Sequence, residues 1–239
     1  MGLFRQAGRL YNINTWSEAK AVAQRENIVM KSFFKLGKTQ AASRGKLLEG
    51  ITVANGDGQQ VLLSNFWKTK TVLLKVLRRF GCPLCRYEIS LLSELKPEFD
   101  ALDVKLIAIG FEKLELKDYL AGRYGDWEVL VDTKKEVYSA LNLKKVSVST
   151  VIKDLISSSR RAAISAAAQA GIHGNLKGDG FQLGGTFVIE KGTGELVYEF
   201  RQSSVSDFSS LKEIYQSCNG DPADVEEKAP RECINYIKA

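Results

Sequence analysis

The chain has 239 residues, 44% of them hydrophobic, which is enough for one sizeable core or for a domain with extensions. No apolar run approaches the ~20 residues of a membrane-spanning helix, and the N-terminus lacks the continuous apolar segment of a secretory signal. The net charge of +6 arises in residues 1–46, with nine Lys and Arg against two Glu, while the remainder has 25 basic and 26 acidic residues and thus no electrostatic basis for nucleic-acid binding.

Residues 1–46 are predicted to form a basic, helical N-terminal extension. A helix over residues 1–13, with no acid before Glu18, would place five apolar residues on one face: Leu3, Phe4, Ala7, Leu10 and Tyr11. The capping-box pattern Thr15-x-x-Glu18 opens a second helix through about Arg25. A short basic amphipathic helix fits an ordinary docking helix, a mitochondrial presequence or a contact with a membrane surface.

The body of the chain, residues 47–217, begins with a predicted β-hairpin whose Asn-Gly-Asp-Gly turn lies at 55–58. The apolar, β-branched run over 71–77 is typical of a buried strand in a mostly parallel sheet. The chain then breaks at Gly81 and restarts with Pro83 at the first position of a helix that carries leucines at helical spacing.

A Cys-x-x-Cys pair, Cys82 and Cys85, stands at the N-terminus of that predicted helix. Free N–H groups and the positive end of the helix dipole favour a thiolate at Cys82, and Arg78, Arg79 and Arg86 add positive charge. Cys85 is one turn on and can attack a sulfur bonded to Cys82, so we expect a nucleophile with a resolving partner and a reversible disulfide. A cycling pair suits a reducing, cytoplasmic compartment, and the basic N-terminus leaves the mitochondrion as the alternative.

Two other roles are open to these cysteines. They could be packed, inert thiols. A zinc site would need a second ligand pair at matching spacing, whereas Cys218, Cys233 and the single histidine, His173, each stand alone. We therefore expect no metal site and favour the redox role.

Strand and helix patterns alternate after this point, and the strand–helix–strand order implies a right-handed crossover. Pro97 marks the end region of the cysteine-bearing helix. The predicted strands are 103–110, 127–132, 186–189 and 195–200. The predicted helices are 114–121, 134–141, 150–170 with Arg160 and Arg161 at its middle, and one capped by Asp207 that runs to about Gln216. Residues 218–239 are expected to form a polar, loosely held tail.

A glycine-dense segment spans residues 171–185. Gly178-x-Gly180 lacks the third glycine of a nucleotide-binding loop, and a strand follows where such a loop needs a helix. A flexible loop packed near the thiols is the better interpretation. His173 is a candidate proton donor there, although a lone loop histidine is more often a surface residue.

Five runs of residues carry a resemblance to a known family. They are Leu77-Arg78-Arg79-Phe80-Gly81-Cys82-x-x-Cys85-Arg86, Leu92-Ser93-x-Leu95-Lys96-Pro97, Val131-Asp132-x-Lys134-Lys135, Gly174-Asn175-Leu176-x-Gly178-x-Gly180 and Leu183-Gly184-Gly185-x-Phe187-Val188. With this order of elements the chain resembles the thioredoxin-like fold in its peroxiredoxin variant and, more narrowly, the peroxiredoxin-like 2 family, which includes prostamide/prostaglandin F synthases. The resemblance covers about residues 47–216 and implies an α/β fold with a central mixed sheet flanked by helices.

The resemblance also implies a chemistry. Such an enzyme reduces a peroxide or endoperoxide O–O bond through Cys82 and Cys85, with Arg79 and Arg86 in the site, no bound cofactor, and electrons from NADPH through thioredoxin. Thiolate attack leaves a sulfenic acid, which the neighbouring thiol converts to a disulfide. A redox regulator or protein-disulfide reductase, and a non-catalytic binding protein, are the alternatives. The intact cysteines and their flanking arginines argue against the last.

Two departures from the related patterns bear on the substrate. Gly184 and Gly185 stand where thioredoxins have a cis-proline, and Arg79 stands where ordinary peroxiredoxins have a threonine, which argues against a fast hydrogen-peroxide reductase. With Phe181 and Leu183 from the adjacent loop, these glycines are expected to leave the thiols open to an apolar groove. A lipid-like peroxide would gain about 0.8 kcal/mol there for each buried CH₂.

Overall fold

The computed structural model describes residues 2–6, 9–13, 46–122, 124–151 and 157–228, and the chain divides into two units, residues 1–41 and 42–239. In the first unit, strands β1 (Gly2–Gln6) and β2 (Arg9–Ile13) pair antiparallel, with Gly2 opposite Ile13. The helix predicted over residues 1–13 is therefore wrong. An isolated helix of this length is marginal and Gly8 weakens it further, whereas the hairpin ladder pairs the backbone groups. The helix predicted to begin at Thr15 lies outside the described residues.

Seven strands form one mixed sheet in the second unit, in the order β4-β3-β7-β6-β5-β8-β9. Their bounds are β3 Thr52–Asn55, β4 Gln60–Leu62, β5 Thr71–Val76, β6 Val104–Gly110, β7 Glu128–Val131, β8 Gly185–Ile189 and β9 Leu196–Arg201. Strands β5, β6 and β7 are parallel, and β8 and β9 continue the sheet antiparallel. The mixed sheet, the hairpin with its turn at 55–58 and the strands predicted at 186–189 and 195–200 are confirmed.

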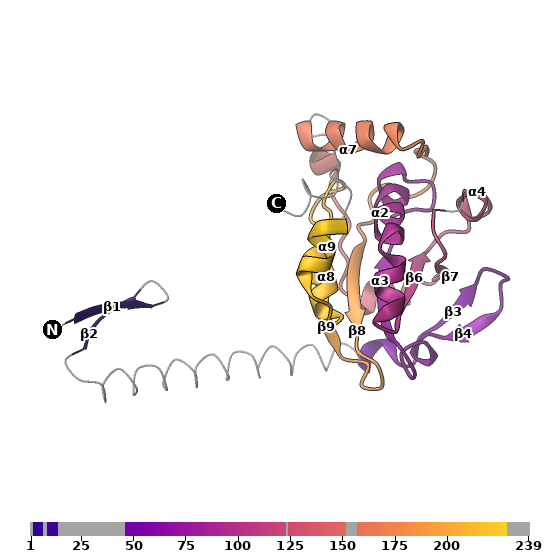
Figure 1. The fold of residues 1–239 in the computed structure, drawn as a ribbon. Coiled ribbons are helices and arrows are strands. Elements are labelled where there is room, and N and C mark those ends of the chain that lie inside the picture. The colour runs from indigo at the N-terminus through magenta and orange to yellow at the C-terminus, as the bar shows by residue number, and fades with distance from the viewer. Residues whose placement is uncertain (1, 7–8, 14–45, 123, 152–156, 229–239) are drawn as a thin grey trace. The chain divides into compact units, whose positions relative to one another are not determined.

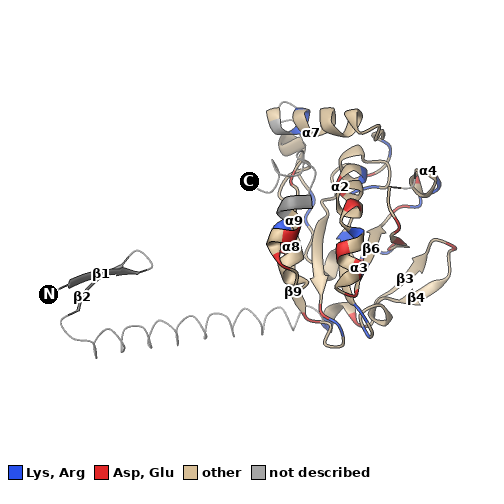
Figure 2. Cartoon of the chain, in the orientation of Figure 1, with Lys and Arg blue, Asp and Glu red and all other residues tan. Residues whose placement is uncertain are grey.

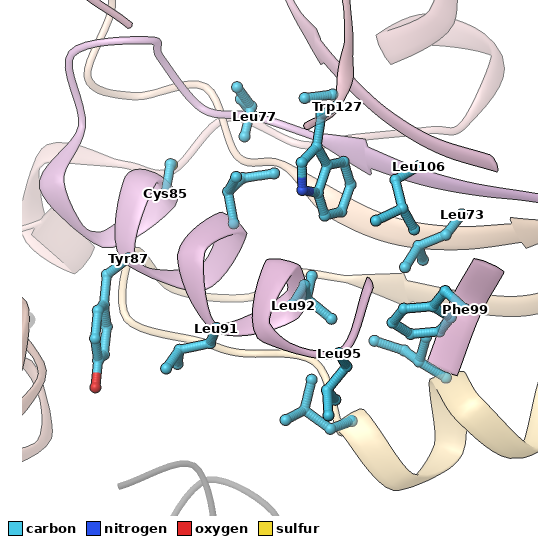
Figure 3. Packing of buried hydrophobic residues seen from close by; sticks show 14 of the residues in the cluster. Leu73, Leu77, Cys85, Tyr87, Leu91, Leu92, Leu95, Phe99, Leu106 and Trp127 are labelled. Atoms are coloured by element: carbon cyan, nitrogen blue, oxygen red, sulfur yellow. The ribbon is translucent and has the colours of Figure 1, made fainter. Parts of the chain in front are cut away.

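The central strand β5 has buried apolar residues on both faces, as its sequence predicts. One face is covered by helices α2 (Pro83–Glu94), α3 (Lys96–Ala101), α8 (Leu211–Ser217) and α9 (Pro222–Lys228), which lie in front of the sheet in Figure 1. Figure 3 shows Leu92 and Leu95 packed beside Leu73, Leu106 and Phe99. This packing fixes the N-terminus of α2 at the end of β5.

Helices α4 (Leu116–Ala121), α5 (Glu136–Ala140) and α7 (Ser158–Gln169) lie elsewhere in the unit, and a 3-10 turn, η1, spans Leu63–Asn65. Residues 148–151 are helical, but the single helix predicted over 150–170 is interrupted at Ser157, which is extended and whose hydroxyl accepts a hydrogen bond from the Arg160 N–H, so α7 begins at Ser158. Arg160 and Arg161 therefore lie in the first turn of α7 and not at its middle.

The C-terminal region differs from the sequence prediction in two places. Ser210 caps α8 by accepting from the Glu213 N–H, whereas Asp207 accepts from the Ser203 N–H in the preceding turn. Residues 218–228 are not loosely held, because they include helix α9 and bury Cys218 and Val225. Residues 229–239 lie outside the described part of the chain.

Pro97 lies in the first turn of α3, after α2 has ended at Glu94, so the proline starts a second short helix. Basic and acidic residues are interspersed over the helices of the second unit (Figure 2), in keeping with the near-neutral charge of residues 47–239. None of the described helices is long and apolar enough to cross a membrane.

Candidate active site

Cys82 is the N-cap residue of α2, at the corner where β5 turns into the helix. Its backbone is extended (φ −75°, ψ 119°), Pro83 follows at the first helical position, and the Arg86 N–H donates to the Cys82 carbonyl at 3.1 Å. Cys85 lies one turn further along. Both thiols are reduced and buried, with 2% and 4% of their surface exposed.

The two thiols have opposite electrostatic environments. The pKa of Cys82 is held well below its ordinary value, chiefly because the Cys85 thiol donates a hydrogen bond to it and also because Arg78 and Arg79 are close, which together outweigh burial. The pKa of Cys85 is raised well above its ordinary value, because its proton is held in that hydrogen bond and because it is buried. The pair is therefore a thiolate beside a protonated thiol.

Arg78 is the arginine that contacts the reactive sulfur. One terminal nitrogen, Nη1, lies 3.7 Å from Cys82 Sγ, and the other donates to the Gly180 carbonyl at 2.7 Å. Arg79 donates to the Lys177 carbonyl at 2.6 Å. Both guanidinium groups are buried, and within the described ranges the Nε atom of each has no hydrogen-bond partner. The site thus holds two buried cations with donor capacity to spare.

Arg86 contacts the backbone and side chains around the site, and none of its hydrogen bonds goes to a sulfur. Its guanidinium donates to the carbonyls of Phe80 at 2.7 Å and His173 at 2.8 Å, and to the Asp118 carboxylate at 2.6 Å. It also donates to the Tyr124 hydroxyl at 3.1 Å. Arg86 thus ties the turn before Cys82 to α4 and to the glycine-rich loop, so we assign it a positioning role.

The glycine-rich loop, residues 171–185, packs directly on the cysteine turn. The Asn175 N–H donates to the Gly81 carbonyl at 2.8 Å. Gly174 has to be glycine here, because a Cβ atom would collide with the Gly81 carbonyl and with Pro83. The His173 carbonyl accepts from Arg86, and His173 and Tyr124 are among the residues that line a cavity of about 460 Å³. No contact between that side chain and either cysteine is recorded among the described residues.

The four predicted substrate-binding residues, Phe181, Leu183, Gly184 and Gly185, lie where the glycine-rich loop leads into β8. Gly184 packs against the Val76 carbonyl, Leu183 is 2% exposed, and Phe181 is 42% exposed. The thiols do not face an open groove, contrary to the sequence prediction, because Arg78 and Arg79 draw the loop carbonyls over them. Leu183 lines a cavity of about 740 Å³ that neither cysteine lines.

Two tyrosines that the sequence analysis did not single out lie near Cys85. Burial raises the pKa of Tyr119 and Tyr138, and nearby acidic groups add to this: Cys85 for Tyr119, and Asp132 and Cys85 for Tyr138. The Tyr138 hydroxyl donates to the Leu77 carbonyl at 2.6 Å, just before the cysteine turn. Both tyrosines therefore stay protonated near the resolving thiol. In the described residues, no three His, Cys, Asp or Glu side chains gather as a metal site requires.

Comparison with known proteins places this chain in a class. A family model described as AhpC/TSA antioxidant enzyme matches residues 91–204, a range that begins after both cysteines. The fold is similar to that of peroxiredoxin 6 from Arenicola marina, solved as a cysteine-to-serine mutant, with a TM-score of 0.51 and 14% identity over 73% of this chain and 71% of that one. The fold is thioredoxin-like in its peroxiredoxin form, and the protein is a peroxiredoxin-like thiol oxidoreductase.

Sequence relatives narrow the class. The chain is 35% identical to the Xenopus tropicalis prostamide/prostaglandin F synthase over 188 residues, which is 78% of this chain and 93% of that protein. It is 34% identical to the Bos taurus protein of the same name over 67% of this chain and 80% of that one. The chain belongs to the peroxiredoxin-like 2 family, as its motifs predict.

Proposed function

We propose that this protein reduces the O–O bond of a lipid-like peroxide or endoperoxide through Cys82 and Cys85. The observation that carries the proposal is the opposed acidity of two adjacent thiols. A thiolate at the N-terminus of α2 is the nucleophile, and a protonated thiol one turn away is held in reserve. A pair of packed, inert cysteines would not need this polarisation.

In the first step, the Cys82 thiolate attacks one oxygen of the peroxide. With a hydroperoxide, the O–O bond breaks, an alcohol leaves, and Cys82 becomes a sulfenic acid; Cys85 then attacks that sulfur, and a disulfide and water form. With a cyclic endoperoxide, the first attack gives a sulfenate ester with an alkoxide in the same molecule, and Cys85 then expels the second oxygen. Two thiols lose two electrons and two protons, and the product is a diol.

The buried guanidinium groups support the first step. Negative charge moves from the Cys82 sulfur to the departing oxygen as the O–O bond breaks. The Nε donors of Arg78 and Arg79 are buried and lack a partner in the described structure, so a developing alkoxide beside Cys82 would find donors already in place. This makes Arg78, together with the predicted Arg79, a candidate for stabilising the transition state.

The names of the sequence relatives support the substrate class. Relatives at 31–35% identity are named prostamide/prostaglandin F synthase, so an oxygenated lipid is the substrate that we propose. The resulting disulfide needs a dithiol reductant, and we propose electrons from NADPH through a thioredoxin-type protein.

Parallel steady-state assays test the proposal. An unsaturated fatty-acid hydroperoxide, a lipid endoperoxide, hydrogen peroxide and a protein disulfide are each supplied with thioredoxin, its reductase and NADPH, and NADPH consumption is followed. We expect kcat/KM for the lipid peroxides to exceed that for hydrogen peroxide at least about tenfold, equivalent to ~1.4 kcal/mol of transition-state stabilisation. A preference for the protein disulfide would instead favour the alternative, a protein-disulfide reductase or redox regulator.

A further inference from the structure

Two large apolar side chains are exposed on the stretch of the glycine-rich loop that covers the thiols. Leu176 is 78% exposed and Phe181 is 42% exposed. They flank the Lys177 and Gly180 carbonyls, which accept hydrogen bonds from the two arginines beside Cys82. The stretch that covers the reactive sulfur therefore presents apolar side chains to the outside.

A second segment, residues 144–148, lies alongside this stretch. The Val146 N–H donates to the Phe181 carbonyl at 2.8 Å, and Val148, two residues further on, is 61% exposed. We call the surface formed by residues 144–148 and 176–181 the loop face. Exposed apolar side chains gathered in this way mark a surface that a protein or a membrane covers.

The ion pairs of the loop face have their cations on the outside. Lys177 pairs with Glu115 at 3.1 Å, and their side chains are 66% and 12% exposed. Lys145 pairs with Asp179 at 3.0 Å, and their side chains are 59% and 23% exposed. Lys144 is exposed as well. Because the carboxylates lie deeper than the lysines, the surface that another molecule meets is basic.

We propose that the loop face docks on an anionic lipid surface. Leu176, Phe181 and Val148 enter the boundary between headgroups and acyl chains, and the exposed lysines contact the acidic headgroups. A lipid surface suits this composition better than a protein does, because lysine is depleted in protein interfaces. Docking brings the stretch that covers Cys82 against the phase in which lipid peroxides dissolve. The proposal rests on the proposed function for its substrate, but the binding itself does not.

Sedimentation of sucrose-loaded vesicles measures docking of the full chain. Vesicles of phosphatidylcholine are compared with vesicles that also contain about 30% phosphatidylserine, and we expect binding to the anionic vesicles to be at least about tenfold tighter. Salt at about 1 M should remove most of this difference, because it screens the headgroup charge. The basic N-terminal extension also favours anionic vesicles, so variants are needed to assign binding to the loop face.

The apolar contribution is tested with a pair of serine variants. Leu176→Ser should weaken binding to the anionic vesicles about fivefold or more, because it removes the most exposed apolar side chain of the loop face. Val197→Ser is the matched control. Val197 is 43% exposed on β9, at the opposite end of the β8–β9 ladder from Gly185, where the loop enters the sheet. This control should bind like the wild type.

The basic contribution is tested with a pair of lysine variants. Lys144→Gln should weaken binding to the anionic vesicles about threefold or more and leave binding to phosphatidylcholine within about twofold. Lys68→Gln, at an exposed position after η1, should change neither. Wild-type affinity in either Leu176→Ser or Lys144→Gln would overturn the docking surface.

Turnover separates docking from the proposed function. A phospholipid hydroperoxide in anionic vesicles and tert-butyl hydroperoxide in solution are each assayed with dithiothreitol as the reductant. Leu176→Ser should lower kcat/KM for the vesicle substrate about threefold or more and leave that for tert-butyl hydroperoxide within about twofold. Equal rates of the wild type and the variant on the vesicle substrate would overturn docking and leave the proposed function standing. Vesicle binding that depends on Leu176, with turnover of neither peroxide, would overturn the proposed function and leave the docking surface standing.

A protein partner is the alternative occupant of the loop face, and the same variant identifies it. The KM for thioredoxin is measured in the wild type and in Leu176→Ser, with dithiothreitol-driven turnover as the reference. Docking on lipid predicts the same KM for thioredoxin in both. A raised KM for thioredoxin in Leu176→Ser, with vesicle binding unchanged, would overturn the lipid proposal and make the loop face the docking site of the reductant.

Discussion

The corner that carries the cysteines and the glycine-rich loop that covers it are held by different interactions. Beneath the corner, Lys75 of β5 and Glu88 of α2 form an ion pair at 2.5 Å with both side chains at most 6% exposed, and the Ser209 hydroxyl donates to Glu88 at 2.8 Å. The loop is held at its edge by more exposed pairs, Asp179 with Lys145 at 3.0 Å among them. The corner is anchored in the core, whereas the loop has both buried anchors, Arg78, Arg79 and Arg86, and exposed ones at its edge.

This difference suits a buried thiol that must meet other molecules. Breaking one member of a buried pair typically costs ~3–5 kcal/mol, whereas an exposed pair is worth ~0–1 kcal/mol. The corner therefore keeps the geometry of Cys82 and Cys85 fixed, while the edge of the loop at Asp179 can separate from its lysine partners at small cost. We expect a substrate or a reductant to reach Cys82 when the loop opens.

The largest expected effect comes from the two thiols themselves. Cys82→Ser should lower turnover by at least about 1,000-fold, because it removes the nucleophile. Cys85→Ser should keep one round of chemistry and leave Cys82 as a sulfenic acid or a mixed disulfide. Single-turnover kinetics and mass spectrometry after oxidant treatment distinguish the two variants.

Cys218→Ser is the matched control for both. Cys218 is buried at the C-terminal end of α8, and burial raises its pKa to about 12, so it is a poor nucleophile. The variant should keep full turnover. A disulfide between Cys82 and either Cys218 or Cys233 in the oxidised wild type would show that Cys85 is not the resolving cysteine.

Stability measurements sharpen the contrast between corner and loop. Glu88→Gln should lower the free energy of unfolding by about 3–5 kcal/mol, because it leaves Lys75 charged and buried without its partner. Asp179→Asn should lower it by about 1 kcal/mol or less, since its lysine partners are partly exposed. Denaturant titrations measure both. Similar losses in the two variants would show that the corner and the loop are anchored alike.

The pH dependence of thiol reactivity tests the electrostatics of the corner. Because the pKa of Cys82 is lowered, its alkylation by iodoacetamide should persist below the ordinary thiol pKa and decline only as the pH falls through the lowered value. Cys85→Ala removes the hydrogen bond that lowers this pKa most and should move the profile to higher pH. Arg78→Gln should move it less, and Arg161→Gln on α7 should not move it.

The corner could be predicted from the sequence, because its structure is encoded locally. An apolar strand, a glycine break, Pro83 at the first helical position and leucines at helical spacing each act within a few residues, and β5 and α2 appear where they were predicted. The redox pair follows from that placement. The sequence does not show which of Arg78, Arg79 and Arg86 contacts the thiol. That depends on the direction in which the turn points each side chain, and no periodicity in the sequence encodes it.

The position of the glycine-rich loop could not be predicted in the same way. Its partners are distant in sequence: Glu112 accepts from the Asp179 N–H, and Arg79 donates to the Lys177 carbonyl. Nothing within residues 171–185 shows that these groups would draw the loop over Cys82. The hairpin of β1 and β2 was missed for another reason. The apolar residues of this stretch follow a helical period over only 13 residues, and that pattern favoured a helix although Gly8 lowers the helix propensity.

The smallest predicted effect concerns how often the loop opens. Cys82 is 2% exposed, so its alkylation reports opening of the loop, and Asp179→Asn should raise the alkylation rate about two- to fivefold by removing pairs worth ~0.2–1 kcal/mol. Raising the salt concentration to about 1 M should do the same in the wild type, because exposed pairs are screened.

Burial opposes ionisation of Asp179, but hydrogen bonds from Lys145, the Phe181 N–H and Lys135 lower its pKa to about 2. The pairs therefore survive at pH 4 and are lost only as the pH falls towards that value, so mild acid should not open the loop. Asp100→Asn removes an exposed pair with Lys96 on α3 and should leave the rate unchanged. An unchanged rate in Asp179→Asn would mean that Arg78 and Arg79 alone hold the loop over the thiols.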